Sequence, residues 1–261
     1  MSPAICCNGV QFANIQAVIF DKDGTLAQVD TFLGQLGQLR CQQLVRLIPD
    51  IQTSVLDSFG LTHDAGSVHS STYSIDPAGL LAVGSRFENV VAIAAHVAAT
   101  GRGWLEALDI VETAFFNADQ ALPLKAPLTP PVPGARELLA QLKAAQLKLG
   151  LLSSDTQTHV ESFAETHQLA SYFSCLQGVS QAFPVKTHPQ FLAQACRTLQ
   201  VDPTKVLVIG DSAADQSIAA HTAGFIGVTG GWSRSFEIIP TVPFLKPQIA
   251  ATSLHQITVK A

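Results

Sequence analysis

Short apolar runs alternate with segments of helical periodicity along the second half of the chain. The apolar runs predict strands over residues 147–152, 173–179, 206–209 and 225–228, and the periodic segments predict helices over 133–145, 156–167, 188–199 and 213–223. A further apolar run, residues 18–20, lies near the start of the chain. Regular strand–helix alternation predicts an α/β protein with a parallel sheet and helices on both faces.

A helical pattern separates the first apolar run from the alternating region. Apolar residues between positions 36 and 59 recur at helical spacing, and a further helix is expected over 104–118. Ser85 and Glu88 form a capping box, which predicts a helix that begins there and ends near residue 100.

Two stretches of this middle region lack a helical pattern. Residues 60–84 are rich in Gly, Ser, His and Asp and are expected to form a long irregular connection. The prolines of residues 123–133 predict a stiff connector that is incompatible with the interior of a helix. We therefore expect three segments, which are a first part of the core at 1–26, an all-helical insert after the first strand at 27–127, and the rest of the core at 128–261.

The composition favours a compact globular protein of one large domain or a core with a smaller module. Of the 261 residues, 47% are apolar and only 13% are charged, and the net charge is −5 without a cluster of lysine or arginine. A nucleic-acid groove and an anionic membrane surface are therefore not expected as partners. The longest apolar helical stretch, residues 90–99, is too short to span a bilayer.

The cysteines indicate a reducing compartment. Their number is five, none of them has the C-x-x-C spacing, and the first twenty residues lack a secretory pattern. Buried thiols in a cytoplasmic protein are therefore expected. A monomer or a homodimer is expected, and the sequence does not distinguish the two.

Polar side chains follow several of the predicted strands. Asp21 and Asp23 follow the first strand, Ser153 another and Asp211 a third, and the carboxyl ends of parallel strands meet at one edge of a sheet. Carboxylates so close together repel each other unless a cation lies between them, and Mg²⁺ prefers such hard oxygen ligands. Asp215 follows Asp211 by one helical turn and so lies on the same side.

These residues belong to motifs that resemble those of the haloacid dehalogenase (HAD)-like hydrolase superfamily. The string Asp21-Lys-Asp-Gly-Thr25 resembles the first motif, and Gly210-Asp-Ser-Ala-Ala-Asp215 resembles the fourth in its G-D-x-x-x-D form. Ser153 matches the hydroxyl residue of the second motif, and Lys186 matches the basic residue of the third. The resemblance covers residues 15–26 and about 130–235. It implies a Rossmann-like core with a helical C1-type cap, and the glycines of residues 224–231 resemble those of the phosphoglycolate phosphatase-like branch.

The resemblance also implies an activity, a cofactor and roles for the residues. The expected reaction is Mg²⁺-dependent hydrolysis of a small phosphorylated metabolite, similar to phosphoglycolate, with Asp21 as nucleophile and Asp23 as general acid and base. The expected metal residues are Asp21, Asp23, Asp211 and Asp215, and the expected phosphate-binding residues are Thr25, Ser153, Ser154 and Lys186. Two departures weaken the substrate assignment, because the branch often has Asn where Ser154 stands and Lys-Pro-x-Pro where this chain has Lys-Thr-His-Pro from residue 186.

Four other functions are alternatives to a phosphatase, three of them within the superfamily and one outside it. A phosphosugar mutase shares every core motif, whereas a dehalogenase needs neither Mg²⁺ nor the second carboxylate. A phosphonatase needs a lysine in the cap, where this chain has only Lys125 within the proline connector. A non-catalytic binding protein would show decay of the nucleophile or metal ligands, and none is visible. In the cap, Arg102 is the candidate for binding a carboxylate or second anion of the substrate.

Overall fold

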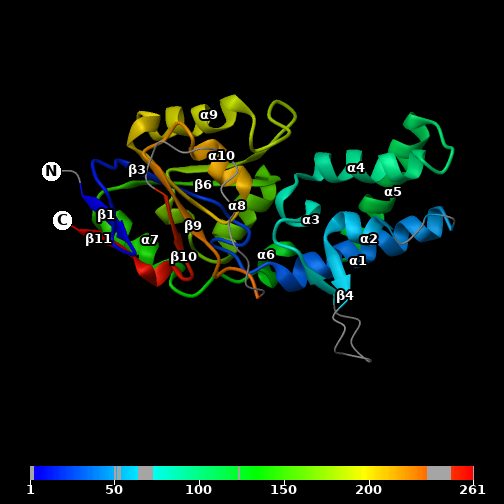
Figure 1. Cartoon of the computed structure of the whole chain (residues 1–261), viewed down its shortest axis with the longest axis horizontal. Coiled ribbons are helices and arrows are strands. Elements are labelled where there is room, and N and C mark those ends of the chain that lie inside the picture. The colour runs from blue at the N-terminus through cyan, green and yellow to red at the C-terminus, as the bar shows by residue number, and fades with distance from the viewer. Residues whose placement is uncertain are drawn as a thin grey trace. The chain divides into compact units, whose positions relative to one another are not determined.

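The computed structural model describes residues 3–49, 51, 54–63, 73–122, 124–233 and 248–260. The chain forms two compact units, the core unit of Met1–Val29 with Thr129–Ala261 and the insert unit of Asp30–Leu128 (Figure 1). No helix of the described residues combines the length and the apolar character that crossing a membrane requires.

A six-stranded parallel sheet forms the centre of the core unit. Its order is β10 (Gln248–Ala251), β9 (Gly224–Val228), β8 (Val206–Gly210), β3 (Ala17–Phe20), β6 (Lys148–Thr156) and β7 (Cys175–Val179). Every neighbouring pair is parallel, which confirms the predicted α/β architecture. All four residues of β3 are buried, and Phe20 lies level with Leu151 of β6 and Ile209 of β8. Such a strand is covered on both faces, so its sequence is continuously apolar.

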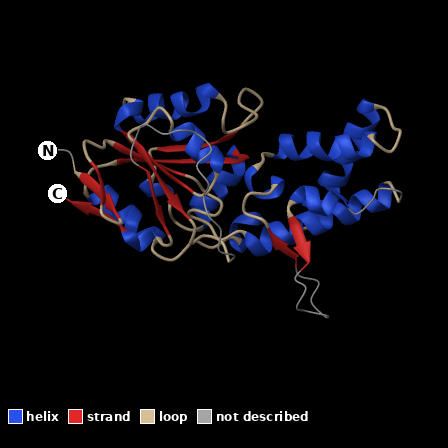
Figure 2. Ribbon diagram, in the orientation of Figure 1, coloured by secondary structure: helices blue, strands red, loops and turns tan. Residues whose placement is uncertain are grey.

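Helices cover both faces of this sheet (Figure 2). The elements are α7 (Ala135–Ala144), α8 (Gln157–Thr166), α9 (Pro189–Leu199) and α10 (Ala213–Ala219), with short 3₁₀ helices η1 (Ala170–Tyr172), η2 (Pro203–Lys205) and η3 (Leu254–Gln256). α9 and α10 bury one face, where Ile19, Val208 and Phe225 lie in one apolar cluster with them. The chain reverses its direction across the sheet after β7, so right-handed crossovers place α8 on the face opposite α9.

A second, antiparallel sheet of the core unit was not predicted from the sequence. It contains β1 (Ala4–Cys7), β2 (Val10–Phe12) and β11 (Ile257–Lys260), in the order β11-β1-β2. The strand at residues 17–20 is therefore the third of the chain, and the expectation that it is the first was wrong. These strands have three or four residues, too few for a clear period-two pattern, and β1 pairs with a segment about 250 residues away.

In the residues that the structure describes, the insert unit contains helices and one strand pair. Its elements are α1 (Asp30–Leu47), α2 (Ser54–Phe59), β4 (Leu61–His63), β5 (Tyr73–Ile75), α3 (Leu80–Val83), α4 (Arg86–Ala98), α5 (Trp104–Ala121) and α6 (Lys125–Leu128). β4 and β5 are antiparallel partners, so the expectation of an all-helical insert with an irregular 60–84 segment is corrected, although residues 64–72 of that segment lie outside the described residues. The Ser85–Glu88 capping box is confirmed at the start of α4.

The proline connector also contains a helical turn that was not expected. Pro127 lies within the four residues of α6, whereas Pro123 lies outside the described residues. A proline is compatible with the first turn of a helix because the amide hydrogen that it lacks would have no partner within the helix there.

Candidate active site

A tight turn after β3 presents the candidate catalytic residues. The main-chain N–H of Asp21 still donates to Ile209 of β8 at 2.9 Å, and the Lys22 carbonyl then accepts hydrogen bonds from Leu26 and Ala27 at 2.9 and 2.8 Å. Gly24 has a φ of +78°, and a Cβ at this position would collide with the side chains of Trp232 and Asp211. The turn therefore requires glycine for its conformation and for its space.

Three carboxylates from separate segments form a buried cluster in the core unit. Asp21 follows β3, Asp211 follows β8 and Asp215 lies in the first turn of α10, and each offers an oxygen within 4.8 Å of the others. Lys186, from the segment before α9, joins them, since its Nζ pairs with Oδ1 of Asp21 and lies 2.6 Å from Oδ1 of Asp215. The structure thus brings together four of the residues that the sequence singled out.

Burial and mutual repulsion change the proton affinity of this cluster. Burial, the largest effect, raises the pKa of Asp21 to about 7, and the charge of Asp215 adds to the rise while Lys186 opposes it. The pKa of Lys186 is raised above its ordinary value, because the attraction of Asp21 and Asp215 outweighs the effect of burial. Lys186 therefore carries a positive charge beside the Asp21 carboxyl at neutral pH.

Asp211 is held by two hydrogen bonds. Its Oδ1 accepts from the Thr25 hydroxyl at 2.8 Å, and its Oδ2 accepts from Nε1 of Trp232 at 2.7 Å. Burial and the charges of Asp21 and Asp215 raise its pKa well above the ordinary value, although both hydrogen bonds act in the opposite direction. Trp232 was not singled out in the sequence, because an indole after a Gly-Gly pair matches no pattern of catalytic residues.

The cluster fits a hard divalent cation. Three buried carboxylates lie together and two of them pair with the Lys186 ammonium group, so full ionisation leaves a local excess of negative charge. The donors are oxygens, which suit Mg²⁺ or Ca²⁺ better than zinc with its preference for nitrogen and sulfur.

Metal binding should therefore depend on pH. Asp21 and Asp211 have raised pKa values in the folded protein. An aspartate of the unfolded chain has a pKa of about 4, whereas the pKa of Asp21 is about 7 in the folded protein. The metal-free protein should therefore lose stability as the pH rises between these two values. At pH 7.5, Mg²⁺ at about 100 times its dissociation constant should raise the melting temperature by roughly 5–10 °C. The same concentration of Mg²⁺ should raise the melting temperature by less at pH 5. Thermal denaturation after chelation, with and without Mg²⁺ at both pH values, measures this difference. An equal rise at both pH values would contradict the assignment of the cluster as the cation site.

Asp23 belongs to a different ion-pair group beside the first. Its Oδ1 lies 2.5 Å from Nζ of Lys22, and the same Nζ lies 2.9 Å from Oδ2 of Asp155 at the end of β6. Asp155 also lies 3.4 Å from Nδ1 of His159 in α8. Lys22 was not singled out in the sequence, although its place between two catalytic candidates was an available signal.

The remaining candidates lie in two different units. In the core unit, Ser153 is buried in β6 and its hydroxyl accepts from the main-chain N–H of Asp155 at 3.1 Å, while Ser154 follows it and is partly buried. Arg102 belongs to the insert unit, in the turn between α4 and α5, where its guanidinium contacts the Thr100 hydroxyl and lies 3.9 Å from Glu106.

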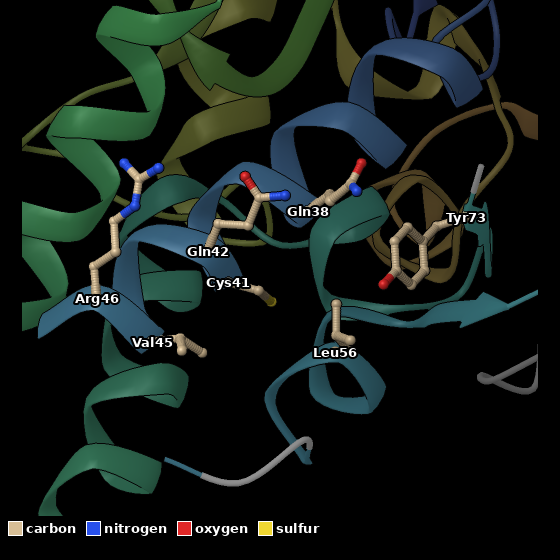
Figure 3. Close-up of a pocket in the computed structure, with 7 residues that line it drawn as sticks. All are labelled: Gln38, Cys41, Gln42, Val45, Arg46, Leu56 and Tyr73. Atoms are coloured by element: carbon tan, nitrogen blue, oxygen red, sulfur yellow. The ribbon is translucent and has the colours of Figure 1, made fainter. Parts of the chain in front are cut away.

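The insert unit also contains a pocket of about 340 Å³ between α1, α2 and β5 (Figure 3). Gln38, Gln42 and Arg46 line it from α1 at four-residue intervals, and Tyr73 lines it from β5. No carboxylate is among the lining residues, so this pocket lacks the kind of acidic cluster that the core unit contains.

Comparison with known proteins relates the chain to hydrolases. The family model for haloacid dehalogenase-like hydrolases matches residues 15–224, a range that contains every carboxylate of the cluster. A phosphoglycolate phosphatase of Synechococcus elongatus is 34% identical over 100 residues, which are 38% of this chain and 45% of that protein. One of Haemophilus influenzae is 30% identical over 113 residues, or 42% of this chain and 50% of that protein. The chain thus spans about half the length of the curated relatives it matches.

Solved structures share the fold. A protein of Bacteroides fragilis described as a haloacid dehalogenase-like hydrolase aligns with a TM-score of 0.63 at 19% identity, over 92% of this chain and 99% of that chain. A HAD-superfamily hydrolase of subfamily IA from Geobacter sulfurreducens aligns with a TM-score of 0.53 at 19% identity, over 93% and 94% of the two chains.

Proposed function

This chain belongs to the haloacid dehalogenase-like hydrolase family, and we propose that it is a Mg²⁺-dependent phosphatase that hydrolyses a small phosphorylated metabolite. The observation that carries the proposal is the buried carboxylate of Asp21 at the end of the central strand, paired with Lys186 and grouped with Asp211 and Asp215. The phosphoglycolate phosphatases among the relatives support a small phosphorylated carboxylate as substrate class.

Asp21 is the proposed nucleophile. One of its carboxylate oxygens attacks phosphorus in line with the ester oxygen, so that the bond from phosphorus to that oxygen breaks and the phosphoryl group remains on Asp21. Lys186 lies against the same carboxylate and keeps it accessible as an anion next to an anionic substrate. Ser153, and Ser154 after it, are the proposed hydrogen-bond donors to the non-bridging oxygens of the phosphoryl group.

Asp23 is the proposed proton-transfer group. It donates a proton to the departing alkoxide, and then accepts a proton from the water that attacks the phosphoryl group on Asp21. In the second step, the bond between phosphorus and the Asp21 oxygen breaks, which returns Asp21 as a free carboxylate and releases inorganic phosphate. The cycle thus leaves both aspartates in their initial protonation states.

The proposed cation ligands are Asp21, Asp211 and Asp215, with the main-chain carbonyl of Asp23. The chemistry that bound Mg²⁺ supplies is positive charge, which offsets the repulsion between the nucleophile and the phosphate dianion. Thr25 and Trp232 orient the Asp211 carboxylate for this purpose, since each donates to one of its two oxygens. Arg102 of the insert unit is the proposed contact to a carboxylate of the substrate.

A substrate screen tests the proposal. Metal-depleted protein should release no phosphate from a panel of phosphorylated metabolites that includes phosphoglycolate, and Mg²⁺ should restore turnover of at least one member. Chelation should abolish that turnover reversibly. Full turnover after exhaustive metal removal would contradict the site as assigned, and a strict requirement for a sugar bisphosphate would reassign the protein as a phosphosugar mutase.

A further inference from the structure

Lys22 is a buried cation that the proposed mechanism does not use. Its side chain is 1% exposed, although it lies between Asp21 and Asp23 in the sequence. Its Nζ contacts Asp23 at 2.5 Å and Asp155 at 2.9 Å, and it lies 5.6 Å from the centre of the Phe163 ring. A buried ammonium group requires such partners, because it has lost its hydration.

Stability of the fold does not explain a charge at this position. A buried ion pair is often no more stabilising than apolar residues of similar volume, and Phe163 already offers an apolar surface for a residue such as methionine. What an ion pair adds is a defined direction for both carboxylates.

The contacts of Lys22 connect two segments that carry candidate catalytic residues. Its carbonyl accepts the hydrogen bonds that close the turn after β3, which fixes its main chain. Its ammonium group reaches Asp155 at the end of β6, and the main-chain N–H of Asp155 donates to the hydroxyl of Ser153. Asp23 is thus tied through Lys22 to the strand end that presents Ser153.

We propose that Lys22 is a positioning residue whose ammonium group, held by Asp155, fixes the Asp23 carboxylate relative to Ser153. The inference rests on the proposed function, in which Asp23 exchanges protons with the leaving group and with water. Lys22 itself gains and loses no proton in the reaction. Its effect is confined to steps that need Asp23 in the correct place.

Kinetics of Lys22→Met test this role. The substitution should slow the first phosphoryl transfer from an alkyl phosphate, measured as alcohol release in a single turnover, by roughly 10- to 100-fold, since a small misplacement of a catalytic group has effects of this size. For p-nitrophenyl phosphate, whose leaving group departs without a proton, release of p-nitrophenol in a single turnover should slow by less than about 3-fold, whereas kcat also includes water attack on the phosphoryl group and should fall for both esters. Asp155→Asn should show the same pattern to a smaller extent, and it provides the test if Lys22→Met does not fold.

Two comparisons separate positioning from a general structural effect. Lys148→Met removes a lysine that donates to the Leu199 carbonyl at the opposite end of β6, and it should affect neither ester. In an Asp23→Asn background, Lys22→Met should cause no further loss, because its target is already absent. Equal losses for both esters in the rate of the first phosphoryl transfer, or fully additive losses in the double variant, would overturn the inference.

A crystal structure of Lys22→Met gives a readout that does not depend on activity. The Asp23 carboxylate should leave its present position or occupy several rotamers, whereas in Lys148→Met it should stay in place. An unchanged Asp23 in Lys22→Met would overturn the inference even if the wild-type protein hydrolyses no phosphate ester. Inactivity of the wild type towards every ester would instead contradict the proposed function alone.

Discussion

Asp21→Asn is expected to lower kcat for phosphate ester hydrolysis by roughly 10⁴-fold or more, which corresponds to about 5.5 kcal/mol of activation free energy. The amide is a poor nucleophile, so no covalent intermediate can form. Steady-state rates of phosphate release in saturating Mg²⁺ measure the effect, and acid quenching followed by mass spectrometry of the intact protein should detect no phosphorylated species.

Two measurements distinguish this loss from misfolding. Asn has nearly the shape of Asp and removes a charge that burial disfavours, so metal-free Asp21→Asn should be at least as stable as the wild type at pH 7.5. Asp202→Asn alters a carboxylate that caps η2 and should retain full activity, because an asparagine also serves as an N-cap. Undiminished turnover by Asp21→Asn would remove Asp21 from the mechanism.

Asp23→Asn is expected to have the second largest effect. It keeps the nucleophile and the three-carboxylate cluster but removes the proton-transfer group, which typically contributes about 10²–10⁴-fold. The loss should be near the upper end for an alkyl phosphate and much smaller for p-nitrophenyl phosphate in the first step. Comparison of the rates at which the two leaving groups are released in a single turnover measures this difference, because kcat also includes the water attack that both esters share.

The same variant should accumulate the covalent intermediate. With p-nitrophenyl phosphate, whose first step is little affected, water attack on the phosphoryl group becomes slower than its formation without a base, so phosphate should remain on Asp21 after rapid quenching. Peptide mapping by mass spectrometry locates the modified residue, and the wild type quenched in the same way is the control. Phosphate found on Ser153 or on a histidine would contradict the assignment of Asp21 as nucleophile.

The alternation of strands and helices in the core unit was predictable because burial leaves a local trace in the sequence. β3 and β8 are covered on both faces, so their residues are continuously apolar and the first polar residue marks the sheet edge. The family resemblance then identified Asp21, Asp211 and Asp215 as one group, and the structure brings these residues together. By contrast, β1 and β11 depend on each other across the length of the chain, and nothing local in either segment indicates the pairing.

The sequence by itself determined which residue types reach the active edge of the sheet, since spacing relative to buried strands is sufficient for that. Only the tertiary structure decided which charges become partners. Lys186 pairs with Asp21 and Asp215, whereas Lys22, adjacent to Asp21 in the sequence, pairs with Asp23 and Asp155. Likewise, Asp211 receives its hydrogen bonds from Thr25 and Trp232. Ion pairs and hydrogen bonds form over about 3 Å between groups whose distance depends on strand order and turn conformation, and the periodicity of a sequence specifies neither.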